Sequence, residues 1–191
     1  MKTLNELFRL VILANELDNN LNAALRFSDP DGIKSGKSGW SFGVCQFDTR
    51  NNGEALKCLA DCGLTQDEIH GIVDQTIDVK SLALNLISHK DIVAKYDEAQ
   101  LSHCLDSAVN FNNAHCIPVN DTAALLAQAD YVNQYGSMGD GFAAYLKSLA
   151  RPVEAHDILT FKLEHTKYGK EHSKDCIRRY ENIIEVIKAN A

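Results

Sequence analysis

Residues 39–48 read Gly39-Trp-Ser-Phe-Gly-Val-Cys-Gln-Phe-Asp48, and they follow the turn-forming stretch Phe27-Ser-Asp-Pro-Asp-Gly32. The glycines in both stretches let the backbone turn sharply or approach a ligand closely. Asp29 and Asp31 flank Pro30, so turn chemistry is expected to hold both carboxylates near the surface. Helical patterns lie on both sides. The sequence therefore predicts a small β-hairpin near the N-terminus of an otherwise helical protein.

The composition is that of a globular domain with a sizeable core. The chain has 191 residues, of which 45% are hydrophobic and 24% charged, which is ordinary for such a domain. Its formal net charge of −7 disfavours a nucleic-acid partner, because nucleic-acid binders usually carry a basic surplus. No stretch approaches the roughly 18 apolar residues of a membrane span. We expect a monomer.

The N-terminus is predicted to be an amphipathic helix and not a secretion signal. Acidic residues, Glu16 and Asp18, follow the apolar run Leu10-Val-Ile-Leu-Ala14, at the place where a signal peptide would have its small-residue cleavage site. We therefore expect the protein to be made in the cytoplasm without a signal peptide.

Hydrophobic spacing predicts helices over most of the chain. Thr65-Gln-Asp-Glu68 has the pattern of a capping box, Asp78 and either Asn120 or Asp121 have that of N-caps, and Pro152 has that of a first-turn proline. The expected helices cover residues 3–18, 52–60, a short segment from 65, 79–89, 90–112, 121–135, a segment ending at 149, 152–166 and 170–189. We expect an α+β, mostly α-helical domain over residues 1–191, with a helix-and-hairpin lobe at about 1–65 and a helical lobe at about 66–191.

The cysteines leave three interpretations open. They are Cys45, Cys58, Cys62, Cys104, Cys116 and Cys176. They could be buried free thiols, since cysteine is a common small core residue, or they could form disulfides, for which an even number allows several pairings. The pairs His103-Cys104 and His115-Cys116 suggest zinc, but their spacing fits no CxxC pattern. We expect buried thiols, no metal and no other cofactor.

The motifs resemble those of the lysozyme superfamily. In its phage-type muramidases an N-terminal helix carries a catalytic Glu, and a short hairpin supplies an Asp and a Thr or Ser that face it. Glu16 lies in the first predicted helix, Arg26-Phe-Ser-Asp-Pro-Asp-Gly32 is similar to the Asp-containing turn, and Trp40-Ser-Phe-Gly43 is similar to the hairpin strand. Residues 39–48 also resemble the hairpin strand of goose-type lysozymes and lytic transglycosylases.

The resemblance implies a lysozyme-like fold that cleaves peptidoglycan between N-acetylmuramic acid and N-acetylglucosamine. Such cleavage needs a protonated carboxyl at the leaving oxygen and an ionised carboxylate across the sugar. Glu16 would be the acid, Asp29 the base or electrostatic stabiliser, and Ser41 the residue that orients water. The candidate substrate-binding residues are Asp31, Gln46, Asp48 and Tyr135.

The sequence departs from the goose-type pattern at one position. Those enzymes carry the catalytic Glu in an Arg-Glu-Ser triplet, whereas Arg26-Phe27-Ser28 has Phe there. The acid is then Glu16, with Glu6 as the alternative, and hydrolysis and transglycosylation both remain open. Asp48 could instead cap the helix that follows it.

Two other functions fit the sequence. A chitosanase-like hydrolase would suit the net charge of −7, because chitosan is a polycation. A non-catalytic lysozyme-fold module would bind glycan or a partner without turnover, which the Phe at position 27 favours. For the preferred function the expected partners are glycan strands and an immunity or delivery protein. The site of action would be the periplasm or cell wall, reached after delivery or lysis.

Overall fold

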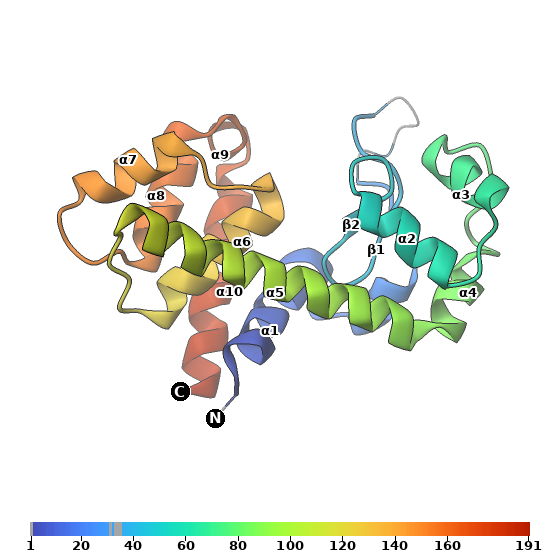
Figure 1. Ribbon diagram of the computed structural model, residues 1–191, viewed down its shortest axis with the longest axis horizontal. Helices are drawn as coiled ribbons and strands as arrows, with labels where there is room; N and C mark the ends of the chain where they lie inside the picture. The colour runs from blue at the N-terminus through green and yellow to red at the C-terminus, as the bar shows by residue number, and fades with distance from the viewer. Residues whose placement is uncertain (1, 31, 33–35) are drawn as a thin grey trace. The chain divides into compact units, whose positions relative to one another are not determined.

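The structure is a computed structural model that describes residues 2–30, 32 and 36–191. It is mostly helical and contains a two-stranded antiparallel hairpin, which confirms the expected fold class. The elements are α1 (Leu4–Leu17), the 3-10 helix η1 (Leu21–Leu25), β1 (Ser41–Phe42), β2 (Phe47–Asp48), α2 (Gly53–Asp61), α3 (Gln66–Val73), α4 (Ala83–Ser88), α5 (Lys90–His115), α6 (Thr122–Tyr135), α7 (Asp140–Ser148), α8 (Ala155–His165), α9 (Lys167–Glu171) and α10 (Ser173–Asn190) (Figure 1).

The chain forms two compact units. The C-terminal unit contains residues 1–15 and 101–191, and the hairpin unit contains residues 16–100. The chain passes from one unit to the other near the end of α1 and again within α5, the longest helix in Figure 1. The division expected near residue 65 falls inside the hairpin unit.

The C-terminal unit is built around α6. Most residues of this helix from Ala123 to Val132 are buried, as expected for a central helix that is covered on several sides. The helices α8 and α10 pack against α6 and against each other. The rings of Tyr131, Phe142 and Phe161 stack or meet edge to face with centroids 4.7–6.1 Å apart. These contacts form an aromatic core between α6, α7 and α8.

The hairpin unit packs short helices around β1 and β2. The helix α2 contacts α3 and β2, and η1 contacts β1 and α4. Phe42 and Phe47 are 0% and 2% exposed, so the hairpin contributes the large side chains of this core. Thr65 and Glu68 form the predicted capping box at the start of α3, which confirms that boundary.

Two predicted helix starts were wrong. The helix expected at 79–89 begins only at Ala83, because Asp78 accepts a hydrogen bond from the Lys80 amide and forms a turn. Pro152 does not open α8. Its neighbour Val153 pairs with Val119 in a parallel bridge, so the chain is still extended there. Glu154 and Asp157 then begin the helix with a capping box.

All six cysteines are free thiols, of which five are buried and Cys116 is exposed. Among the described residues, no group of three or more His, Cys, Asp or Glu side chains is arranged to hold a metal ion. No helix within the same residues is both long and apolar enough to cross a membrane.

Candidate functional site

The hairpin is held on both edges of β1. Ser41 pairs with Asp48 and Phe42 with Phe47 across the two strands. On its other edge, Ser41 exchanges two backbone hydrogen bonds of 2.8 Å with Ser28. Ser41 is therefore only 2% exposed. This buried position leaves its side chain little access to a water molecule that attacks a substrate.

Ser28 and Gln46 form the polar contact that the hairpin presents near Asp29. The exposed Ser28 hydroxyl donates to Gln46 Oε1 at 2.8 Å, and Gln46 Nε2 donates to the carbonyl of Gly43 at 2.9 Å. Sequence reasoning missed Ser28 as a site residue. The one feature of the sequence that could have identified Ser28 is its position directly before Asp29.

Asp29 lies in the turn that leads out of the bridge with β1. It is partly buried, and its Oδ1 accepts a hydrogen bond from the Gly32 amide at 3.1 Å. Such a contact between an Asp side chain and a nearby amide is typical of Asp-containing turns. The second acid of this segment, Asp31, lies outside the described residues.

Asp48 orders the loops around the hairpin. Its Oδ1 accepts hydrogen bonds from the amides of Gly39 and Arg50 at 2.9 and 2.8 Å, and its Oδ2 accepts one from the Asn51 side chain at 2.7 Å. Partial burial of Asp48 acts to raise its pKa, but these hydrogen bonds outweigh it and lower the pKa below its usual value. The N-cap of α2 is Asn52 and not Asp48.

Glu16 stands on the last turn of α1 and is partly buried. Asp18 and Asn19 then adopt left-handed φ values of 47° and 63°, which reverse the chain. The chain continues into η1, where the carbonyl of Ala24 accepts a hydrogen bond from the Gly43 amide at 2.8 Å. A short ordered segment therefore connects Glu16 to the hairpin turn.

The end of α1 is held by polar contacts within the C-terminal unit. Arg178 donates to the carbonyls of Ala14 and Asn15, in the last turn of the helix, at 3.4 and 2.9 Å, and a cation at this end of a helix also interacts favourably with its dipole. The Asn15 side chain donates to Asp130 at 3.0 Å and accepts from Asn182 at 2.9 Å. The residue before Glu16 is thus fixed on two sides.

Asp130 is the centre of a buried charge network. Its carboxylate contacts Lys162 Nζ at 2.9 Å, and Arg179 at 2.5 and 3.2 Å. Burial acts to raise the pKa of Asp130, but the two cations outweigh it and hold the pKa far below its usual range. Nothing in the local sequence marks this network, because Lys162 and Arg179 lie 32 and 49 residues from Asp130.

Glu6, the alternative acid, lies in the first turn of α1. Its carboxylate accepts hydrogen bonds from the Thr3 amide at 2.6 Å and from the Thr3 hydroxyl at 3.0 Å. The amide contact and then the hydroxyl contact lower the pKa of Glu6. Glu6 therefore caps the start of the helix and favours the charged form, which suits a general acid poorly.

Phe27 and the candidate substrate-binding residue Tyr135 both pack against other aromatic rings. The Phe27 ring meets Phe42 edge to face with centroids 5.7 Å apart, so Phe27 helps to seat the hairpin. Tyr135 belongs to the C-terminal unit, where its ring stacks on Tyr131 at 4.3 Å and its hydroxyl lies 3.2 Å from Thr166 Oγ1. Burial raises the pKa of Tyr135.

A further missed residue is Asp97 on α5, in the hairpin unit. It is 2% exposed and accepts a hydrogen bond from the Cys45 amide, in the hairpin turn, at 3.0 Å. Its signal was helical spacing, because Asp97 lies four residues from both Val93 and Leu101, which are buried. A charged residue at a core position of a helix marks a specific contact.

Comparison of the chain with protein-family models, with curated proteins and with solved structures gave no match.

Proposed function

We propose that this protein is a glycoside hydrolase with a lysozyme-like fold that cleaves the N-acetylmuramic acid–N-acetylglucosamine backbone of peptidoglycan. Glu16 is the general acid and Asp29 the base or electrostatic stabiliser. The observation that carries the proposal is the attachment of Glu16. It stands on the last turn of α1, and within the hairpin unit an ordered segment, bound to the hairpin turn through the Ala24 carbonyl, leads from it to the stretch that carries Asp29.

This attachment matters because glycoside cleavage depends on two carboxylates held at a fixed separation on either side of the bond. An acid on a fixed helix end keeps its geometry between encounters with substrate, which lowers the entropy cost of reaching the transition state. Phe27 packs against Phe42, so the position that carries the acid in goose-type enzymes serves the hairpin core here. That observation also favours Glu16 as the acid.

The hairpin supplies the groups that bind the sugar. Gln46 Nε2 donates one hydrogen to the Gly43 carbonyl, so its second N–H can donate to the carbonyl oxygen of an acetamido group. The exposed Ser28 hydroxyl extends the same polar face. The proposed partners are glycan strands and an immunity or delivery protein, and the proposed site of action is the periplasm or cell wall.

The test is loss of turbidity of purified peptidoglycan. We expect the wild type to clear it, and Glu16→Gln to lower the rate by about 100-fold or more, since general acid catalysis contributes about 10²–10⁴-fold. Asp29→Asn should also lower it. Glu181→Gln and Asp106→Asn, which change exposed acids outside the site, are the matched controls. If Glu16→Gln still clears peptidoglycan, the assignment of Glu16 as the acid is wrong. If neither the wild type nor any variant clears it, peptidoglycan is not the substrate.

A chitosanase-like hydrolase is the second candidate, and the charge distribution favours it. The hairpin unit contains fourteen Asp and Glu residues and eight Lys and Arg residues, so it accounts for −6 of the net charge of −7. An acidic surface attracts a polycationic sugar. Release of reducing sugar from chitosan, without clearing of peptidoglycan, would favour this substrate over the first.

A further inference from the structure

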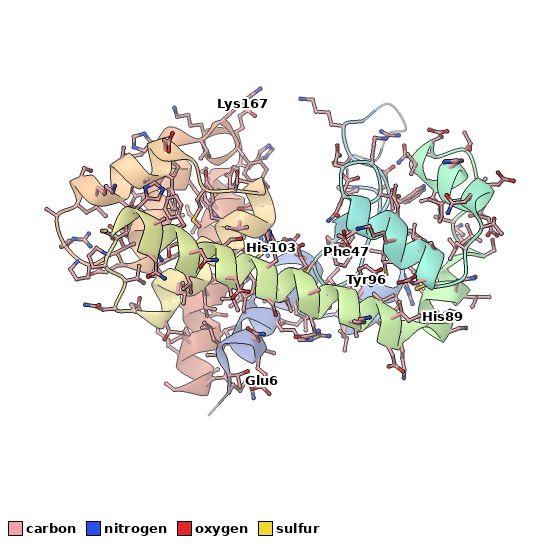
Figure 2. The ribbon with its side chains drawn as sticks, in the orientation of Figure 1. Glu6, Phe47, His89, Tyr96, His103 and Lys167 are labelled. Atoms are coloured by element: carbon pink, nitrogen blue, oxygen red, sulfur yellow. The ribbon has the colours of Figure 1, made fainter. Side chains whose placement is uncertain are left out.

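The hairpin turn at Gly43–Gln46 is packed directly against the carboxylate of Asp97. Besides the hydrogen bond from the Cys45 amide, a Cβ on Gly43 would stand 2.9 Å from Asp97 Oδ1 and 2.8 Å from the Phe47 ring. Only glycine fits between the turn and the helix at that point. Figure 2 labels Phe47 on β2 and Tyr96, the residue before Asp97, on α5.

The turn has a conformation that needs such support. Gly43 and Gln46 both have left-handed φ values, 79° and 52°. Residues other than glycine rarely adopt this region, and they remain there only where the surroundings fix them. In this conformation the Gln46 side chain donates to the Gly43 carbonyl and accepts from the Ser28 hydroxyl.

Burial makes the contact with Asp97 specific. A buried carboxylate is costly unless hydrogen-bond donors satisfy it, and a hydrogen bond from an amide to a charged acceptor is stronger than one between neutral groups. The Cys45 amide is such a donor, from a residue 52 positions away in the sequence. A conformation of the turn that points the Cys45 amide elsewhere would remove that donor from the carboxylate.

We propose that Asp97 is a positioning residue for sugar recognition. It holds the Gly43–Gln46 turn through the Cys45 amide. This turn then keeps Gln46 against Ser28, on the face that binds the acetamido group. Asp97 itself does not touch the sugar. This inference rests on the proposed function and adds that recognition of the N-acetylated sugar depends on a carboxylate beneath the hairpin.

The first test uses Cys45 as a reporter of the turn. Cys45 is 7% exposed, whereas Cys58, in the same unit, is 0% exposed and lies outside the turn. In a Cys116→Ser background, which removes the exposed thiol, Asp97→Ala should speed the labelling of Cys45 by a soluble disulfide reagent by about 10- to 100-fold. That range corresponds to the loss of one hydrogen bond to a charged acceptor. Cys58 should stay protected.

Two variants sharpen the labelling test. Asp97→Asn keeps an oxygen that accepts the amide hydrogen bond, so it should retain much of the protection of Cys45. Asp91→Asn changes an exposed acid on the same helix and should label like the wild type. Unchanged protection of Cys45 in Asp97→Ala would overturn the proposal, as would labelling of Cys58 at the same rate, because Asp97 would then support the whole unit.

The second test is kinetic and separates this proposal from the function. With a soluble N-acetylated glycan, Asp97→Ala should raise KM about tenfold and change kcat less than threefold, as expected when only binding is lost. A fall in kcat at constant KM would overturn the role in recognition. Failure of the wild type to cleave any glycan would remove the proposed function, while the labelling result would still decide whether Asp97 holds the turn.

Discussion

Replacement of Asp130 by asparagine tests whether the buried charge network holds the C-terminal unit together. Asp130 is 0% exposed, and Lys162 and Arg179 are 4% and 3% exposed. In the variant both cations would face a neutral amide. Breaking a buried ion pair by removal of one partner costs about 3–5 kcal/mol. Because two cations lose the same carboxylate, we expect a loss at the upper end, about 5 kcal/mol.

Lys162→Met is the matched control. It removes one of the two cations and leaves the contact between Asp130 and Arg179 in place. The methionine also retains packing next to the rings of Tyr131 and Tyr135, which lie about 6 Å from the ammonium group. Since Asp130 keeps Arg179 as a partner, we expect a cost well below that of Asp130→Asn.

The assay is urea unfolding at neutral pH, followed by far-UV circular dichroism and by fluorescence. The single tryptophan, Trp40, lies in the hairpin unit, whereas the network lies in the C-terminal unit. With a slope of about 2 kcal/mol per molar urea, a loss of about 5 kcal/mol moves the dichroism midpoint down by about 2.5 M. A tryptophan midpoint that moves less would show that the effect is confined to one unit.

The pH dependence provides a second measurement on the same pair of proteins. The pKa of Asp130 is lowered in the folded state, so its contribution to stability is fully present above the unfolded pKa of about 3.9. It is lost as the pH falls through the folded pKa. The difference in unfolding free energy between wild type and Asp130→Asn should therefore be constant near neutral pH and shrink only below about pH 4.

Two results would refute this reasoning. If Asp130→Asn lowers the free energy of unfolding by less than about 1 kcal/mol, the buried network contributes no more to stability than an exposed ion pair does. A Lys162→Met cost equal to that of Asp130→Asn would show that the ammonium group, and not the shared carboxylate, determines the stability.

Three further predictions concern close packing and the hairpin loops. Gly43→Ala places a Cβ 2.8 Å from a ring carbon at a φ of 79°, and should cost about 3 kcal/mol, whereas Gly32→Ala, at a φ of 66° with open space, should cost about 1 kcal/mol in thermal unfolding. Gly169→Ala would bring a Cβ to 1.8 Å from a carbonyl oxygen of α8 and should cost about 3 kcal/mol, whereas Gly141→Ala in open space on α7 should be neutral or stabilising. Because the pKa of Asp48 is lowered, its stabilising effect over Asp48→Asn should hold above about pH 4 and fall with pH below it, as measured by urea midpoints.

The elements that the sequence predicted correctly are those set by local patterns. The hairpin follows from the glycines and the turn-forming residues around it, and the Thr65 capping box and an N-cap at Asn120 or Asp121 follow from residues two or three positions away, with the structure placing the cap at Asp121. The start of α8 was misplaced because a bridge between Val119 and Val153 keeps the chain extended after Pro152. The local sequence around Pro152 does not predict that bridge.

The candidate site was predictable only in part, for the same reason. Asp29, Gln46 and Asp48 stand in a recognisable stretch, and the structure brings them into one hairpin segment or directly beside it. The residues that hold this segment and the end of α1 come from far along the chain. Asp97 is 52 residues from its partner in the turn, and Asp130 is 115 residues from Asn15. Helical spacing predicts that such a residue is buried, but it does not predict which distant group forms a hydrogen bond with it.

The two buried carboxylates illustrate different uses of a costly group. Asp130 faces two cations and joins its own helix, α6, to three others, so its removal should appear mainly as lost stability of the C-terminal unit. Asp97 accepts a hydrogen bond from a backbone amide of the hairpin turn and lies against Gly43, so we expect its removal to change that turn. An apolar residue could fill either volume, but it would not distinguish one conformation of the Gly43–Gln46 turn from another. The position of Gln46, and with it the proposed recognition of the sugar, therefore depends on the chemistry at Asp97 more than on the packing around it.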